Sequence, residues 1–448
     1  KKESSLFIAL LVVILASVGG LGVYVKNVGQ SKKEINKWIK EDISYLRNLY
    51  IDIHQNPEIS LMEKETSKKL AGELNKIGFD VTENFGGYGI VGIFENGDGP
   101  NILYRTDLDA LPMEEKTNLP YASKVKTTDI YGSEVGTMHS CGHDMHMTVW
   151  TGTARALIEK KDQWSGTLIM IGQPAEEIGA GAMMMLNEGL YSKFPVPDLG
   201  IALHSSPTIL SGKVGFGKGY IMANTESVDI TVFGEGAHGA APHMSIDPIV
   251  TASLIVMELQ TIVSRNINPL DDAVITVGSF RGGTKHNIIP DEVKLQLTIR
   301  TYKDEVRNLI HKRIKEICDG IGASVGLDKS RWPKITMPDT YTPANYNDPD
   351  LVDRLIFSAS NSIGNENVVM AEPQMVGEDF ARYGKTKEKI PTVMYWLGTV
   401  PEERMNKYKN GNYALPALHS PYYYPEVEKT IETGVLVTTN ALIDLFNK

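Results

Sequence analysis

One eight-residue stretch, His139 to His146, gathers three histidines, a cysteine and an aspartate. Cys141 and His143 are two positions apart, and in an extended or looped backbone side chains at this spacing face the same side. A thiolate and an imidazole directed at one point are ligands that transition metals prefer in proteins. This stretch therefore predicts part of a metal site.

Two adjacent carboxylates, Glu176 and Glu177, follow a predicted strand at residues 167–171. In open α/β sheets the carboxyl ends of the strands line the binding crevice. Because adjacent side chains in a non-helical turn point to different sides, one carboxylate can bind a metal while the other accepts a proton from an attacking water. A solvated acidic pair is the alternative, but the position at a strand end, with Gly179 and Gly181 following, favours function.

Further polar residues follow other predicted strands. His204 comes directly after residues 199–203, and His419 lies in a proline-containing segment near the end of the sequence. Either histidine alone would more often be structural than a ligand. Asp107 and Asp109 follow a third predicted strand and can orient ligand imidazoles, although local turn formation explains them nearly as well.

Composition limits the classes of protein that this chain can be. With 448 residues it is too long for one simple core, and its net charge of -10 argues against nucleic acid as a partner. Its two cysteines, Cys141 and Cys318, cannot form a disulfide framework. Cys318 falls on the apolar stripe of a predicted helix and is expected to be buried, whereas His54 and His311 are expected at the surface or at helix caps.

The elements that must position these residues follow an α/β pattern. Between residues 90 and 203 short apolar strands alternate with helices, which indicates a sheet with helices on its faces. After residue 219 the order becomes strand, helix, strand, strand, helix, as in a ferredoxin-like α+β unit, with a possible last strand near Gly322. The expected divisions are an N-terminal segment at 1–30, a first catalytic part at 31–218, an inserted domain at 219–332 and a second catalytic part at 333–448.

The N-terminal segment is strongly apolar. No residue from Leu6 to Val25 is charged, and Lys1 and Lys2 precede it. Since a spanning helix needs about 20 such residues, we expect an uncleaved membrane anchor with an extracytoplasmic catalytic domain. A cleavable signal peptide ending near Ala16, giving a secreted or periplasmic protein, is the alternative.

Eight motifs occur in an order that resembles the aminoacylase, hippurate hydrolase and auxin-conjugate hydrolase branch of the dinuclear zinc-dependent metallopeptidases. They extend over essentially all of the chain after about Trp38. One such motif would be a weak signal, whereas eight in order are very specific. The motifs are RTDLDALPM from Arg105, GTMHSCGHDMH from Gly136, QPAEE from Gln173, LHSSP from Leu203, GEGAHGAAPH from Gly234, GTKHNIIPDE from Gly283, GEDF from Gly377 and LHSPYY from Leu418.

The resemblance implies a mixed-sheet catalytic domain that binds two divalent metal ions. With one bridging ligand, five donors give each metal three protein ligands and leave a shared position for water. In this branch Cys141 stands where other members place a bridging carboxylate; a soft bridge favours zinc, with manganese, cobalt or nickel as alternatives. The implied metal ligands are Cys141, His143, Glu177, His204 and His419, the implied general base is Glu176, and the expected supporting residues are Asp107, Asp109 and Asp144.

The inserted domain is implied to pair two subunits, to act as a lid and to lend residues to the site. His238 is implied to donate a hydrogen bond to the oxyanion, either in its own chain or in the site of a partner subunit. Asn287 and Arg300 are implied to hold a substrate carboxylate, which a guanidinium matches with two parallel hydrogen bonds. Without the resemblance, Arg300 would be an ordinary surface cation.

Together these residues predict a metal-dependent amidohydrolase that cleaves N-acyl amino acids or small peptides with a free carboxylate, through a metal-bridging water activated by Glu176. A dipeptidase or carboxypeptidase is the alternative within the same chemistry. A thiol hydrolase with Cys141 as nucleophile and His143 as base is disfavoured, because attack geometry needs a third orienting group. A non-catalytic binding protein is disfavoured because every expected donor is present.

Overall fold

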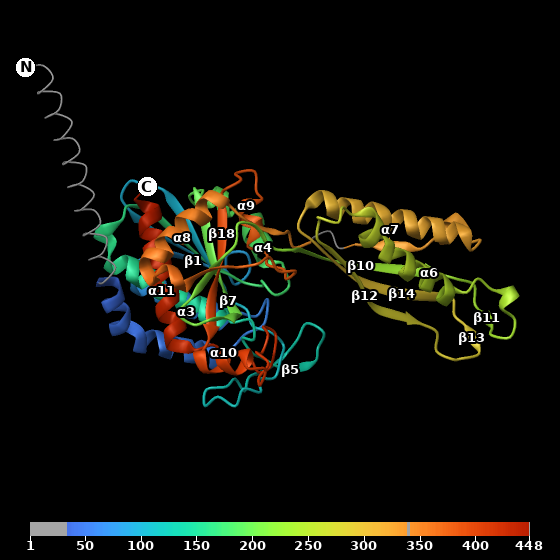
Figure 1. Ribbon diagram of the computed structural model, residues 1–448, viewed down its shortest axis with the longest axis horizontal. Helices are drawn as coiled ribbons and strands as arrows, with labels where there is room; N and C mark the ends of the chain where they lie inside the picture. The colour runs from blue at the N-terminus through green and yellow to red at the C-terminus, as the bar shows by residue number, and fades with distance from the viewer. Residues whose placement is uncertain (1–33, 338–340, 448) are drawn as a thin grey trace, which may run out of the picture.

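The computed structural model describes residues 34–337 and 341–447. This part of the chain folds into two units, a larger one around an eight-stranded sheet and a smaller, elongated one around a four-stranded sheet (Figure 1). Both the N-terminal and the C-terminal parts of the described chain belong to the larger unit. The smaller unit is therefore inserted between them.

The eight-stranded sheet is mixed. Its order is β1-β2-β6-β3-β7-β18-β8-β17. The central strands β6, β3, β7 and β18 run parallel to one another, whereas β2 pairs antiparallel with β1 and β6, and β8 antiparallel with β18. The strands are β1 (Asp80–Glu83), β2 (Ile90–Asn96), β3 (Asn101–Asp107), β6 (Gly166–Gln173), β7 (Leu199–Leu210), β8 (Val214–Phe216), β17 (Val368–Met370) and β18 (Thr392–Val400). The predicted mixed-sheet α/β fold is confirmed.

Helices cover both faces of this sheet, because alternate strand residues point to opposite sides. In β3, Tyr104 packs into the core under the longer helices and Leu103 into the core under the shorter ones, and both are fully buried. A helix over residues 34–55 also joins the first core. One face carries α2 (Lys64–Lys76), α3 (His143–Glu159), α8 (Pro349–Ile363) and α11 (Val427–Phe446), and the other carries α4 (Gly181–Asn187), α5 (Leu190–Lys193) and α9 (Ala381–Gly384) (Figure 1).

The smaller unit has the strand order β12-β14-β10-β15, all antiparallel where paired, with its own apolar core. α6 begins where the Asp247 side chain accepts the N–H of Ile249 at 2.8 Å, with Pro248 in the first turn. The elements are β10 (Asn224–Phe233), α6 (Pro248–Thr261), β12 (Ala273–Gly282), β14 (Glu292–Thr301), α7 (Asp304–Ser324) and β15 (Lys334–Thr336). In chain order this is β-α-β-β-α-β, the ferredoxin-like order.

The last strand of the smaller sheet differs from the expectation. Gly322 lies in α7, where a Cβ would meet the ring of Trp332 at 3.0 Å, so it marks a close approach rather than a strand. The pairing strand is β15, which joins β10 through Ile335 and Ile230. The sheet therefore continues past residue 332.

Short elements complete the described chain. The remaining strands are β4 (Lys126–Thr128), β5 (Glu134–Gly136), β9 (Gly219–Met222), β11 (Ala237–His238), β13 (Ile288–Ile289) and β16 (Asn345–Asn347), and the remaining helices are α10 (Glu402–Lys409), four 3₁₀ turns at Lys161–Gln163, Pro242–Met244, Lys329–Arg331 and Asn365–Asn367, and a π segment at Ile262–Asn266.

The membrane assignment is corrected by the structure. Across residues 34–337 and 341–447, no helix is both long enough and apolar enough to cross a bilayer. α11 has 20 residues, but it carries charges at Glu428, Lys429, Glu432 and Asp444. The apolar segment at residues 6–25 lies outside the described residues. The predictions of a membrane anchor, a membrane partner and an extracytoplasmic or periplasmic location are therefore withdrawn.

Candidate metal centre

The five predicted metal ligands come together at one edge of the large sheet. The Sγ atom of Cys141 lies 3.6 Å from Nε2 of His204 and 3.2 Å from Nε2 of His419. Glu177 lies between two imidazoles, with Oε2 at 3.4 Å from Nε2 of His419 and Oε1 at 3.8 Å from Nε2 of His143. Residues from four distant parts of the sequence thus form one cluster.

Backbone geometry fixes two of these ligands. Gly142, between Cys141 and α3, has φ 83°, and a Cβ there would meet Oγ of Ser205 at 2.9 Å, so only glycine allows this turn without strain. His419 has φ 59°, an uncommon value for a non-glycine residue, and its N–H donates to the carbonyl of Ser140 at 2.9 Å. Both positions fit a functional constraint on the backbone.

Asp107 and Asp109, at and just after the end of β3, contact two imidazoles beside the cluster. The Nδ1 atom of His143 donates to the backbone carbonyl of Asp109 at 2.8 Å, which leaves Nε2 to face the cluster. The Asp109 carboxylate accepts the N–H of Glu177 at 2.9 Å, and Asp107 lies 2.8 Å from Nδ1 of His146. These contacts orient the donors.

The donor set fits two divalent cations. Among the described residues, Nε2 of His143 and Oε1 of Glu177 are buried without a hydrogen-bond partner. Five groups of donor atoms in the described residues each fall within 4.8 Å, and two of them contain the thiol: Cys141, His143 and His204 form one, and Cys141, Glu177 and His419 form the other. The thiol is common to both groups. Thiolate, imidazole and carboxylate at such spacing suit zinc, and also manganese.

Electrostatics favour a cation at this point. Burial, with Glu177 and Glu176 nearby, raises the pKa of the Cys141 thiol well above its usual range. Burial lowers the pKa of His204 and keeps its imidazole neutral, as a metal ligand must be. Burial and the neighbouring carboxylates of Glu378 and Glu177 raise the pKa of Glu176. An added positive charge would stabilise each ionised acid here.

Arg105, Glu378 and Asp379 belong to the site, although no role was assigned to them from the sequence. Arg105 is fully buried, with Nη1 2.8 Å from Asp107 and Nη2 2.9 Å from Glu378 and 3.3 Å from Asp379. Gln173 also donates to Asp379 at 2.7 Å. Arg105 lies in the motif RTDLDALPM, and Glu378 and Asp379 lie in GEDF. Arg105 and Glu378 are 273 positions apart, so the sequence did not show that they pair.

Asp144 and His54 occupy different surroundings from those expected. Asp144 pairs with Nδ1 of His54 at 2.6 Å, away from the ligand imidazoles, and His54 also approaches Glu115 at 3.2 Å. Only 1% of His54 is exposed, so the expectation of a surface histidine was wrong. His311 is also not a free surface residue, because its Nε2 lies 2.6 Å from Glu226.

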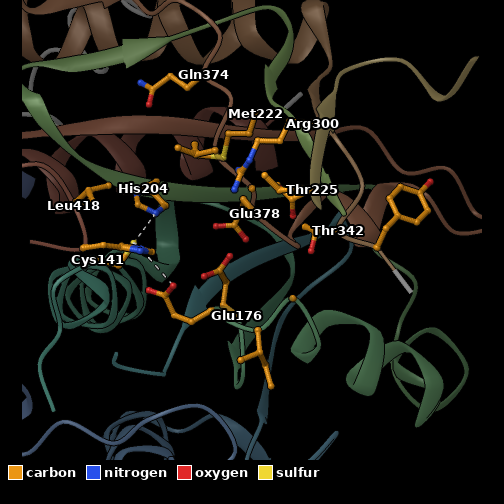
Figure 2. Close-up of a pocket in the computed structure, with 18 of the residues that line it drawn as sticks. Cys141, Glu176, His204, Met222, Thr225, Arg300, Thr342, Gln374, Glu378 and Leu418 are labelled. Carbon is orange, nitrogen blue, oxygen red and sulfur yellow. Dashed lines mark hydrogen bonds and ion pairs between the residues drawn. The ribbon is translucent and has the colours of Figure 1, made fainter. Parts of the chain in front are cut away.

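A cavity of about 660 Å³ opens at the cluster. Cys141, Glu176 and His204 lie beside one another in it, and Arg300 also lines it (Figure 2). The guanidinium of Arg300 donates to the carbonyl of Met375 at 2.7 Å, so it is not the free surface cation that sequence alone would suggest. The cavity is thus bounded by both units.

His238 and Asn287 are not brought to this cavity. His238 is in β11, which pairs with β13 directly after Asn287, and both residues are exposed. These two strands lie at the end of the smaller unit that is far from the large sheet (Figure 1). Neither residue can act in the site of its own chain in this arrangement.

A thiol, imidazoles and carboxylates gathered at one edge of a mixed α/β sheet are donors that a metal-dependent hydrolase uses. The chain belongs to peptidase family M20/M25/M40, whose family model matches residues 103–421. The resemblance drawn from the motifs is thereby confirmed.

Relatives in this family carry names of amide hydrolases. The chain is 37% identical over 358 residues to N-acetylcysteine deacetylase of Bacillus subtilis, covering 79% of this chain and 88% of that protein. It is 36% identical over 432 residues to thermostable carboxypeptidase 2 of Saccharolobus solfataricus, covering 95% and 99%. A solved structure of Bacillus subtilis YxeP, described as a dinuclear metal-binding peptidase of the M20 family, matches with TM-score 0.73 and 29% identity, covering 91% and 99%.

Proposed function

We propose that this chain is a dinuclear metal-dependent amidohydrolase that cleaves N-acyl amino acids. The observation that carries the proposal is the shared thiol of Cys141, which belongs to two donor groups beside Glu176 in a cavity that Arg300 also lines. The deacetylase and dinuclear peptidase among the relatives support the same chemistry.

The five donors hold two divalent cations, preferably zinc or manganese. When bound, these cations lower the pKa of a water and polarise the carbonyl of the substrate. Glu176, whose Oε2 lies 3.8 Å from Nε2 of His143, accepts the proton of the attacking water. The same carboxyl then delivers this proton to the nitrogen of the leaving amino acid, so it is ionised again after the turnover.

Arg300 recognises the free carboxylate of the substrate. It reaches the cavity from β14, and its contact with the Met375 carbonyl places the guanidinium at the junction of the two units. A guanidinium donates two parallel hydrogen bonds to a carboxylate, which an ester cannot accept as strongly. The cavity has room for a small acyl group and one amino acid, in the size range of small-molecule sites.

The proposal predicts carboxylate-dependent hydrolysis. Metal-loaded protein is expected to release free amino acid from N-acetyl amino acids, and Arg300→Ala is expected to lower kcat/KM for the acid by about 10- to 10²-fold because charged hydrogen bonds are lost. The matching methyl ester of the substrate should be affected little. Arg313→Ala is the control, because Arg313 lies on α7 and pairs with Glu316 away from the cavity.

Three other results would contradict this assignment. Activity that survives a chelator but is lost with a thiol reagent would indicate a thiol hydrolase. Release of a C-terminal residue from dipeptides, without cleavage of N-acetyl amino acids, would indicate a carboxypeptidase. Equal loss on the acid and on the ester in Arg300→Ala would remove the proposed role of the guanidinium.

We also propose the domain division 31–218, 219–332 and 333–448, in which the inserted domain pairs two copies of the chain and acts as a lid over the cavity. Val250, Leu254 and Met257 of α6 follow helical spacing and are 55%, 46% and 72% exposed. β12 is an edge strand of its sheet, so its outer backbone groups can also pair. A second copy would cover this apolar face, and its His238 and Asn287 could then reach the cavity.

The proposed pairing of two copies predicts a dimer that a single charged substitution on the apolar face of α6 disrupts. Met257→Glu is expected to convert the dimer to a monomer in sedimentation experiments and to reduce hydrolysis, because the charge is placed on the apolar face. Tyr131→Glu is the matched control, since Tyr131 is 86% exposed in a loop of the larger unit. A monomeric wild type, or a monomeric variant that is still active, would contradict the proposal that His238 of one copy acts in the cavity of the other.

A further inference from the structure

The turn that precedes the proposed base has a strained backbone. Ala175 has φ 52°, in the left-handed region that a residue with a Cβ rarely adopts. It lies directly before Glu176, and the dihedral angles at Ala175 set the direction in which the chain leaves for Glu176. Because such conformations persist only where the surroundings hold them, some other group must fix Ala175.

The N–H of Ala175 is held by the side chain of Glu63. Its Oε1 atom accepts the N–H of Ala175 at 2.8 Å and the N–H of Leu61 at 2.9 Å. Leu61 is also left-handed, with φ 68°. One carboxylate oxygen therefore joins two strained turns that are 114 positions apart in the sequence (175 − 61).

Burial makes this contact strong. Glu63 is 0% exposed, and its second oxygen, Oε2, has no hydrogen-bond partner in the part of the chain that the structure describes. Glu63 is the residue before α2, yet its side chain does not cap that helix. The bond from Leu61 stays within the turn of Glu63 itself, so Ala175 is the partner that this buried carboxylate holds across the fold.

The segment after Ala175 is held by other carboxylates. Asp109 accepts the N–H of Glu177 at 2.9 Å, and Asp379 accepts the N–H of Ala182 at 3.0 Å. Glu176 is thus flanked by two anchored backbone groups, one at Ala175 and one at Glu177. The Ala175 carbonyl also accepts the N–H groups of Ala180 and Gly181 at 3.1 Å, so Glu63 is the anchor of this turn that comes from outside the segment following the base.

We propose that Glu63 is a positioning residue for the base Glu176. It acts by accepting the N–H of Ala175 and so keeps the turn left-handed; it touches neither substrate nor metal ligand. The inference rests on the proposed function for the role of Glu176, whereas the anchoring of the turn can be measured without any substrate. The proposed role needs only an oxygen that accepts the N–H of Ala175. An amide oxygen at position 63 should therefore hold the turn as well as a carboxylate does.

The test compares Glu63→Gln with Glu63→Ala in metal-loaded protein. Hydrogen exchange of the peptide covering residues 174–182, followed by mass spectrometry, should be at least about tenfold faster in Glu63→Ala and unchanged in Glu63→Gln. Glu63→Ala should also lower kcat by about 10²-fold with little change in KM, because the base is misplaced while binding is kept. Glu63→Gln should keep most of the wild-type kcat.

Two further variants separate positioning from folding. Glu73→Ala is the matched control, because Glu73 is a buried carboxylate of α2 that pairs with Tyr45 and Lys76 away from the turn. If Glu63→Ala does not fold, Glu63→Asp takes its place: it keeps the charge but draws the oxygen back by about 1.5 Å, so the same losses are expected.

Each outcome decides the proposal. Wild-type exchange of residues 174–182 in Glu63→Ala, or in Glu63→Asp, would overturn it, as would a wild-type kcat. Equal losses in Glu63→Gln and Glu63→Ala would also overturn it, because the amide retains the acceptor. If wild-type protein does not hydrolyse amides, the proposed function fails, and the exchange rates alone decide whether Glu63 anchors the turn.

Discussion

Glu176→Gln is expected to lower kcat for N-acetyl amino acids by about 10²- to 10⁴-fold while the bound metal is retained. An amide is nearly the same size as a carboxyl group but does not accept the proton of the attacking water. Glu176 is 8% exposed and lines the cavity, so neither folding nor access should change greatly. Steady-state kinetics and metal analysis of the same preparation measure the two quantities.

Glu177→Gln is the informative comparison for this variant. Both glutamates share a donor group with His143, but only Glu177 also shares one with Cys141 and His419. Loss of metal is therefore expected in Glu177→Gln and not in Glu176→Gln. If Glu176→Gln loses its metal, or still turns over substrate at the wild-type rate, Glu176 is not the base.

The two adjacent carboxylates of the candidate metal centre were predictable because they follow the end of a strand. Glu176 and Glu177 follow β6, and Asp107 ends β3, so parallel neighbours bring them to one edge of the sheet. His204 was expected just beyond its strand but lies inside it, because β7 continues to Leu210 through its pairing with β18. The side chain still reaches the edge where the ligands meet.

Pairings between distant residues were not predictable from one sequence. Arg105 contacts Glu378 and Asp379 only because the fold brings β3 beside the segment before α9. His54 was misplaced for the same reason, since its partner Asp144 is 90 positions away. When the sequence does not reveal the partner of a charged residue, that residue is predicted to be exposed to solvent.

Cys141→Ala is expected to weaken the binding of both cations. The thiol is the one atom common to the two donor groups, so its removal leaves each cation with two of its three protein ligands. The loss of affinity should exceed the about 10- to 10²-fold effect of removing an outer hydrogen-bond partner of a ligand. Equilibrium dialysis with zinc measures this affinity, and hydrolysis should fall with it.

The second cysteine provides the matched control. Cys318 is fully buried in the apolar core of the smaller unit and belongs to no donor group among the described residues. Cys318→Ala is therefore expected to keep the wild-type metal affinity. Equal metal affinity in Cys141→Ala and Cys318→Ala would show that the thiol of Cys141 is not a ligand.

The number of metal ions per chain tests the central claim most directly. Wild-type protein loaded with zinc or manganese, freed of excess ion and measured by elemental analysis, is expected to contain two ions per chain. A fully folded, loaded preparation without bound ions would contradict the assignment of the five donors to a dinuclear centre.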